Sequence, residues 1–114
     1  MREFVSTSVF DRFWSDLGLS DEDLRRFQNY LLQSPGAGDV IEGTGGAIKA
    51  RFALPGKGKR GGVRVICFDL ASAQKLYLLT CYPKSKQSNL SVSEKAAIKE
   101  VVKRIIKREK EGLG

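Results

Sequence analysis

Eight basic residues in the middle of the sequence have the chemistry to bind phosphate groups. Arginine offers a planar fork of donors that matches phosphate oxygens, and lysine adds a compact positive charge. Like charges gathered in one place repel one another and oppose folding, so such a cluster predicts a polyanionic partner, most often a nucleic acid. The eight are Lys49, Arg51, Lys57, Lys59, Arg60, Arg64, Lys84 and Lys86.

Cations of this kind are sufficient for one reaction on RNA, because RNA carries its own nucleophile, the 2′-hydroxyl. A site must orient that hydroxyl, remove its proton, stabilise charge on the phosphate and protonate the leaving 5′-oxygen. Arginine suits the charge stabilisation, and a lysine crowded by other cations suits proton transfer because crowding lowers its pKa. The reaction needs no metal ion, and it is specific for RNA because DNA lacks the hydroxyl.

The sequence contains no histidine, which excludes several kinds of active site. A Ser-His-Asp triad and a ribonuclease built on a histidine pair are both impossible. A zinc site is equally disfavoured, because the two cysteines, Cys67 and Cys81, lack C-x-x-C spacing. Both cysteines fall in expected strands, and we interpret them as small buried side chains in a reducing compartment.

The segment GKGKRG, residues 56–61, fits the dinucleotide-binding pattern G-x-G-x-x-G, but its context does not. That motif requires a preceding strand and a following helix whose N-terminus faces a pyrophosphate. Here Pro55 precedes the segment and a strand-like run, GVRVICFDL, follows it. We interpret the segment as a basic hairpin loop, whose glycines either allow close approach to a nucleic-acid backbone or simply shape the turn.

The length of 114 residues suits one domain with one core, so we expect a single domain over residues 1–114. Hydrophobic residues make up 41% and charged residues 29%, which is typical of a globular chain. The net charge of +7 is uneven: residues 1–42 carry four basic against eight acidic residues, and residues 43–114 carry sixteen against five. With no apolar run of membrane length and no signal peptide, we expect a cytoplasmic protein.

Hydrophobic spacing predicts three helices that frame the basic segment. The first ends at Gly18, and Ser20 with acidic residues behind it starts the second, which ends near Pro35. The third follows a capping box at Ser91–Glu94 and has a basic outer face, and we expect its last six residues to fray. The first helix has an apolar face that we assign to the core, formed by Val9, Phe10, Phe13, Trp14 and Leu17.

Three strands are expected over residues 48–54, 63–70 and 75–82, joined as an antiparallel meander. The first alternates, with Lys49 and Arg51 on one face, and the other two are apolar on both faces. On neighbouring strands, Arg64 would lie beside these two cations. Residues 2–6 are expected to form a short strand, and residues 36–46 a glycine-rich loop.

Two segments together resemble the RelE/HigB superfamily of bacterial toxins, in particular its HigB-like branch: GDVIEGTGGAIKARFALPGKGKRGGVRVICFDL and YLLTCYPKSKQSNLSVSEKAAIKEVVKRI. The resemblance runs from about Phe10 to Ile106. It implies an α+β, microbial-ribonuclease-like RelE fold, with an antiparallel sheet, two N-terminal helices and one C-terminal helix. It also implies the toxin of a type II toxin–antitoxin system, a ribosome-dependent mRNA endonuclease that inhibits translation without a metal or other cofactor.

The resemblance implies site residues as well. Arg64 matches the phosphate or transition-state stabiliser, and Lys84 and Lys86 match a base, an acid or a phosphate clamp. RelE has a tyrosine at the start of the last helix where this chain and the HigB-like branch do not, so the acid–base pair stays open, and Tyr82 is either a substitute or a packing residue. The predicted RNA-binding residues are Lys49, Arg51, Lys57, Lys59, Arg60 and Tyr82.

The implied partners are messenger RNA, the ribosome and a small cognate antitoxin, usually a helix-turn-helix DNA-binding protein encoded next to the toxin. Operator DNA would be contacted only through the antitoxin, and no membrane is involved. Two alternatives stay open. One is a gyrase poison of the ParE type, a branch that generally lacks the basic cluster, and the other is an inactive toxin that binds nucleic acid or antitoxin as a co-repressor.

Overall fold

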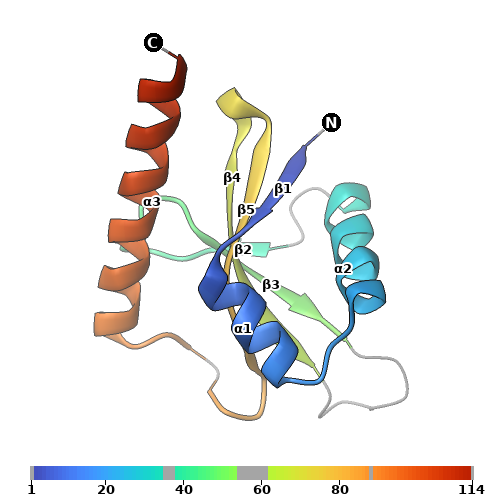
Figure 1. The fold of residues 1–114 in the computed structure, drawn as a ribbon. Helices are drawn as coiled ribbons and strands as arrows, with labels where there is room; N and C mark the ends of the chain where they lie inside the picture. The colour runs from blue at the N-terminus through green and yellow to red at the C-terminus, as the bar shows by residue number, and fades with distance from the viewer. Residues whose placement is uncertain (1, 35–37, 54–61, 88, 114) are drawn as a thin grey trace.

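A computed structural model describes residues 2–34, 38–53, 62–87 and 89–113 (Figure 1). The fold is α+β, as the sequence predicts. No helix of these ranges is both long enough and apolar enough to cross a membrane. In chain order the elements are β1 Glu3–Ser6, α1 Ser8–Asp16, α2 Asp21–Gln33, β2 Gly38–Val40, β3 Ile48–Phe52, β4 Val63–Leu70, the 3-10 helix η2 Ala71–Ala73, β5 Lys75–Pro83 and α3 Val92–Leu113.

Five strands form one mixed sheet in the order β1-β5-β4-β3-β2. The meander β3-β4-β5 is antiparallel, as predicted, and β1 adds to it in parallel beside β5. The expectation of an uninterrupted loop over residues 36–46 is wrong, because Gly38–Val40 pairs with β3. Glycine suits this pairing, since a Cβ at Gly38 would lie 3.1 Å from the carbonyl oxygen of Lys49. A strand of three residues is too short to give a periodic signal in the sequence.

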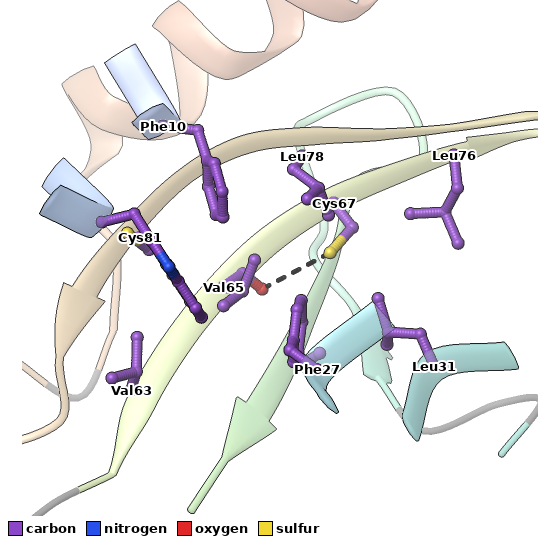
Figure 2. Packing of buried hydrophobic residues seen from close by; sticks show 11 residues of the cluster. Phe10, Phe27, Leu31, Val63, Val65, Cys67, Leu76, Leu78 and Cys81 are labelled. Carbon is purple, nitrogen blue, oxygen red and sulfur yellow. Dashed lines mark hydrogen bonds between the residues drawn. The ribbon is translucent and has the colours of Figure 1, made fainter. Parts of the chain in front are cut away.

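One hydrophobic core lies between the sheet and the two N-terminal helices. Figure 2 shows Phe10 of α1 and Phe27 and Leu31 of α2 reaching toward Val65 and Cys67 of β4. Both N-terminal helices therefore cover the same face of the sheet (Figure 1). Burial raises the pKa of Cys67 and of Cys81 to about 12, and both thiols are free, which confirms their interpretation as buried core side chains.

Only some of the apolar side chains of α1 are buried in this core. Phe10 and Trp14 are 0% and 4% exposed, whereas Val9 and Phe13 are 49% and 38% exposed. The expectation that all the apolar residues of this helix are core is therefore wrong. The helix presents a second, outward stripe that the described residues leave uncovered.

A second core lies on the opposite face of the sheet, under α3. It is formed by Ala47, Ile66, Phe68, Tyr77, Leu79, Tyr82, Leu90, Ile98 and Val102. The capping box predicted at the start of α3 is confirmed, because the Glu94 backbone N–H donates to Ser91 Oγ at 3.1 Å and the Ser91 N–H donates to Glu94 Oε1 at 2.8 Å. The sheet is therefore covered on both faces, as the apolar strands predict.

A β-bulge in β5 decides which side chains share a face. Ile66 pairs with Thr80 and the next residue of β4, Cys67, pairs with Leu78, so that Leu79 is the extra residue. Side chains alternate along a strand, and one extra residue shifts that alternation. As a result Leu78 packs under the N-terminal helices, whereas Tyr82 lies on the α3 face. Without the bulge Tyr82 would lie on the face of α1 and α2.

The C-terminal end of α3 is fastened to the sheet. Glu109 Oε1 accepts hydrogen bonds from Tyr77 Oη at 2.6 Å and from Lys75 Nζ at 2.8 Å. The helix continues to Leu113, so the expectation of a frayed tail is wrong for residues 109–113, and Gly114 lies outside the described residues. The anchor joins residues more than 30 positions apart, which no local pattern in the sequence reveals.

Candidate functional site

Three polar side chains form a row across the α3 face of the sheet. Arg51 of β3 is the register partner of Arg64 of β4, and Arg64 is the register partner of Tyr82 of β5. Directly opposed residues in an antiparallel pair point to the same face, with Cα atoms about 5 Å apart. The arrangement that the sequence predicts for Arg51 and Arg64 is confirmed, and Tyr82 completes the row.

Arg64 carries its charge into the protein interior. The residue is only 6% exposed, and its Nε is buried and has no hydrogen-bond partner among the residues that the structure describes. The ion pairs in the described ranges involve other cations, namely Arg2, Arg26, Lys75 and Lys103. A buried guanidinium without a carboxylate costs stability, because desolvation is not offset by an opposite charge. Such a group is prepared for an anion that arrives from outside.

Tyr82 has a second unpartnered polar atom beside Arg64. The residue is 8% exposed, and its hydroxyl is buried without a hydrogen-bond partner in the described part of the chain. Burial raises the pKa of Tyr82, and the nearby Arg64 opposes this shift only in part. The phenol therefore keeps its proton at neutral pH, and in this form it donates a hydrogen bond rather than removing a proton.

Lys84 lies two residues after Tyr82 and opposite Gly62, on the same α3 face of the sheet as Arg64 and Tyr82. Its backbone N–H donates to the Gly62 carbonyl at 3.0 Å, which extends the β4–β5 pairing beyond the last residue of β5. A Cβ built on Gly62 would lie 3.7 Å from the Lys84 Cδ, so the lysine side chain passes over this glycine. The exposed ammonium of Lys84 thus belongs to the same end of the sheet as Arg64 and Tyr82.

Lys49 lies on the same face as Arg51 but is held by a neighbour. Its Nζ donates to Asn89 Oδ1 at 3.3 Å, which ties the segment between β5 and α3 to β3. The two residues line a hollow of about 230 Å³ that also contains the carboxylate residues Asp39 and Glu42. Lys49 therefore borders the row, and its surroundings already contain negative charge.

Lys86 lies in the turn after β5 and is directed toward the start of α3. Its backbone N–H donates to the Pro83 carbonyl at 3.1 Å, and its side chain is exposed. The hydrogen bond from the Ser91 N–H lowers the pKa of Glu94, with smaller contributions from the Gln87 amide and from the charge of Lys86. Lys86 therefore lies close to a carboxylate.

The site predicted from the sequence is thus brought together in part. Arg51, Arg64, Tyr82 and Lys84 share one end of one face, while Lys49 and Lys86 lie at its borders beside Asn89 and Glu94 respectively. Lys57, Lys59 and Arg60, together with the rest of the hairpin loop over residues 54–61, lie outside the described residues.

Sequence reasoning missed the residues that organise the β5–α3 connection. Gln87 Nε2 donates to the Asn89 carbonyl at 3.0 Å and to Glu94 Oε1 at 3.1 Å. These bonds link the turn that carries Lys86 to the first turn of α3. The capping box at Ser91–Glu94 was a signal for the helix start, but nothing in the sequence indicates that its glutamate also binds the preceding turn.

The row can hold a phosphate by chemistry that its residues supply themselves. Arg51 and Lys84 are exposed cations at its rim, Arg64 is a buried donor, and Tyr82 is a protonated hydroxyl next to it. Donors fixed in a site of low dielectric stabilise developing negative charge without reorganisation.

A comparison with protein families agrees with the fold described above. The family model described as RelE toxin of the RelE/RelB toxin–antitoxin system matches residues 1–114. The chain belongs to the RelE toxin family.

Proposed function

We propose that the chain is an endoribonuclease of the HigB-like branch that cuts messenger RNA on the ribosome and so inhibits translation. The observation that supports this most strongly is Arg64, a buried cation with an unpartnered Nε next to the unpartnered hydroxyl of Tyr82. A toxin that acted only by binding a partner through its surface would have no use for a buried, uncompensated charge, which lowers its own stability.

In the proposed reaction the 2′-hydroxyl of the RNA attacks the adjacent phosphorus. The bond from phosphorus to the 5′-oxygen of the next nucleotide breaks, and a 2′,3′-cyclic phosphate remains on the upstream product. Arg64 stabilises the negative charge that develops on the phosphate oxygens, with Arg51 at the rim of the row. The proton of the 2′-hydroxyl passes to a base and another proton passes to the leaving oxygen, so the charge is balanced.

Tyr82 and the two lysines have different proposed roles in this reaction. Tyr82 is protonated at neutral pH, and it donates a hydrogen bond to the phosphate or to the leaving oxygen. Lys84 clamps the phosphate or transfers a proton, because it is exposed over the same face. Lys86, beside Glu94, contributes to RNA binding in the turn after β5. The reaction as proposed uses no metal ion or cofactor.

The proposed partners follow from this activity and from the family. The substrate is messenger RNA in the ribosome, so the proposed location is the cytoplasm. The antitoxin of the pair is proposed to be a small helix-turn-helix protein encoded beside the toxin, which neutralises it and connects it to operator DNA.

The experiment that tests the proposal maps 3′ ends on a defined messenger RNA, incubated with the purified chain in the presence and in the absence of translating ribosomes. We expect cuts inside A-site codons, only with ribosomes, and ends that carry a cyclic phosphate. The variant Arg64→Lys keeps the positive charge and loses the planar fork of donors. It should remove the cuts, which would show that the fork and not the charge alone is required.

Three other results would change the proposal. Cuts on free RNA would keep the nuclease and remove the ribosome from the mechanism. No cuts together with inhibition of DNA gyrase would replace the nuclease with a ParE-type poison. No cuts, no gyrase inhibition and harmless overproduction without the antitoxin would leave a co-repressor.

A further inference from the structure

A hollow of about 230 Å³ lies between the hairpin of β2 and β3 and the first turn of α3, next to the row. It contains the carboxylates of Asp39 and Glu42, the ammonium groups of Lys49 and Lys95, and the amide of Asn89. The proposed reaction uses neither carboxylate, and carboxylates beside an RNA site repel the backbone that the row attracts. The hollow therefore calls for a ligand of its own.

The balance of charges in the lining excludes several kinds of ligand. A phosphate group is repelled by the two carboxylates, and a metal cation is repelled by the two ammonium groups. No group of three potential metal-ligating side chains occurs in the part of the chain that the structure describes. The volume lies below the range of about 300–1,000 Å³ that drug-sized ligands occupy. A small uncharged ligand with both donors and acceptors suits such a lining, and next to an RNA site that ligand is a nucleobase.

Among the four bases of RNA, guanine has the edge that matches this lining. Its N1–H and N2–H₂ groups are adjacent donors that one carboxylate accepts together, whereas adenine, cytosine and uracil each have one donor group. Its O6 and N7 atoms are acceptors, and lysine is a usual donor to them. A carboxylate on the hairpin and an ammonium group on α3 are thus the combination that guanine fits best.

Glu42 is carried by a rigid turn between β2 and β3. The turn is built around Thr44, which is 0% exposed. Thr44 Oγ1 donates to the Ile41 carbonyl at 2.6 Å and accepts from the Ala47 N–H at 3.1 Å. Gly46 has a φ of +118°, which residues with a side chain rarely adopt. The backbone at Glu42 is therefore fixed relative to β3, which lowers the ordering cost of binding a base.

The opposite side of the hollow supplies donors for the acceptor atoms of the base. Lys95 contributes its ammonium group from the first turn of α3. Asn89 Oδ1 accepts from Lys49 Nζ at 3.3 Å, and this bond directs the Asn89 Nδ2, which only donates, to another side. Asp39 is the register partner of Lys49, so these two opposite charges lie across the hairpin from each other. Lys95 and Asn89 are therefore the donors assigned to O6 and N7.

The position of the hollow relative to the row suits a nucleotide next to the cleaved bond. Lys49 and Arg51 are two residues apart on β3 and point to the same face, so they are separated by about 7 Å. A base on the ribose beside a phosphate at Arg51 reaches the hollow over this span. Val40, which lines the hollow and is 72% exposed, provides an apolar surface for the flat face of the base.

We propose that this hollow binds the guanine base of a nucleotide adjacent to the cleaved phosphate, with Glu42 as its specificity-determining residue. Glu42 accepts from N1–H and N2–H₂, and Lys95 and the Asn89 amide donate to O6 and N7. The assignment of the base to messenger RNA rests on the proposed function, whereas the recognition of guanine rests on the hollow alone. The base site selects where the message is cut, and it takes no part in the chemical step.

The test measures binding by fluorescence anisotropy, with RNA hexanucleotides whose 2′-O-methyl groups block the nucleophile and so prevent cleavage. Three probes differ at one position, which carries guanine, hypoxanthine or uracil in an otherwise all-uridine strand. Each is titrated with the full-length wild type, with Glu42→Gln and with the control Glu22→Gln, which changes an exposed glutamate of α2 on the other side of the sheet. Glu42 is exposed and glutamine keeps its size, so the fold is retained.

We expect the wild type to bind the guanine probe about tenfold more tightly than the uracil probe, which is the discrimination of one bidentate base contact. Hypoxanthine lacks the N2 amino group, and its probe should fall between the two. Glu42→Gln should reduce the ratio of the guanine and uracil affinities to about twofold or less, and Glu22→Gln should keep the wild-type ratio. The ratio is the decisive readout, because removal of a negative charge raises the affinity for every probe alike. On ribosomes, guanine should be enriched beside the cuts of the wild type and not beside those of Glu42→Gln.

Equal affinity of the wild type for the guanine and uracil probes would overturn the proposal, as would an unchanged ratio in Glu42→Gln. If 5′-guanosine monophosphate competes as well as the unlabelled guanine strand, the occupant is a free nucleotide and the assignment to the message is overturned. If no chain cuts RNA but the affinity ratio still depends on Glu42, the proposed function fails and the guanine site stands.

Discussion

Arg64 is a residue whose local environment opposes its own charge. Its register partners are a second arginine and a tyrosine, and its Nε has no acceptor within the described ranges. Natural proteins accept this kind of cost where a site needs a prepared charge, so that stability and activity become opposed at one position. The consequence is testable at this residue alone.

Replacing Arg64 by Met should separate activity from stability. Methionine keeps most of the side-chain volume and removes the buried charge, so the free energy of unfolding should rise by about 1 kcal/mol or more. Cleavage should fall by about 10²–10³-fold, the usual loss when one donor to a developing oxyanion is removed. Urea unfolding and single-turnover cleavage measure the two effects. A less stable Arg64→Met chain would mean that the guanidinium has a structural partner.

Tyr82→Phe tests the second unpartnered atom of the row. Removal of a buried hydroxyl without a hydrogen-bond partner should leave the free energy of unfolding unchanged or slightly higher. Cleavage should fall by about tenfold or more if the hydroxyl donates to the reacting phosphate. The measurement is the same pair of assays. Full activity with a lower unfolding free energy would show that the tyrosine serves only packing.

At the scale of elements, α3 depends on a contact near its far end. The helix has 22 residues, and Glu109 joins its last turns to Lys75 and Tyr77 of β5. The start of the same helix is fixed by Glu94, which binds both Ser91 and Gln87. Two carboxylates thus set the position of the element that covers the face of the candidate site.

The contribution of Glu109 should be visible in the pH dependence of stability. Hydrogen bonds from Lys75 and then Tyr77 lower the pKa of Glu109 from its usual 4.5, so the contribution is complete above that value and is lost as the pH falls through the lower, folded-state pKa. Burial, and then the hydrogen bond to Glu109, raises the pKa of Tyr77 to about 12, so stability also falls between pH 10 and 12.

Glu109→Gln should therefore melt at a lower temperature than the wild type at pH 7, and the difference should shrink as the pH falls below 4.5. Thermal unfolding followed by circular dichroism at several pH values measures this. Glu111→Gln is the matched control, because Glu111 lies in the same turn and is exposed. A constant difference across the acid range would contradict the assignment.

At the scale of the whole molecule, charge is divided between the two sides of the sheet. Residues 1–42, which include α1 and α2, carry four basic against eight acidic residues, and the remainder carries sixteen against five. The acidic helices cover one face, and the cationic row lies on the other. A polyanion should therefore approach the molecule from one side.

RNA binding should weaken with salt in proportion to the number of phosphates contacted. For single strands the logarithm of affinity falls by about 0.7 per contact for each decade of salt. Lys84→Ala should make this slope shallower by about 0.7, because it removes one phosphate contact, whereas Arg25→Ala on α2 should leave the slope unchanged. Fluorescence anisotropy with an RNA oligonucleotide measures both. Equal slopes for the two variants would remove Lys84 from the interface.

The parts of this molecule that were predictable from the sequence are those governed by local periodicity. The capping box at Ser91–Glu94 and the alternation of Lys49 and Arg51 each follow from side-chain spacing along one element. The register that sets Arg51 opposite Arg64 agrees with the predicted meander.

The rest depended on contacts between distant segments. The bulge at Leu79 places Tyr82 beside Arg64, and a single extra residue leaves no periodic trace. The outward stripe at Val9 and Phe13 looks like core in the sequence, because periodicity does not tell which of two adjacent stripes the sheet covers. The anchor at Glu109 likewise required the position of β5.

The role of the RNA 2′-hydroxyl as the nucleophile is tested by a cleavage assay on a programmed ribosome, with a message that carries one 2′-deoxynucleotide at the mapped cleavage position. If the cationic row only positions the RNA and stabilises its phosphate, the 2′-hydroxyl is the nucleophile. We expect cleavage at that position to be lost, while an otherwise identical all-ribose message is cut. Cleavage of the 2′-deoxy message at an unchanged rate would contradict the proposed reaction, because the nucleophile would then have to come from elsewhere.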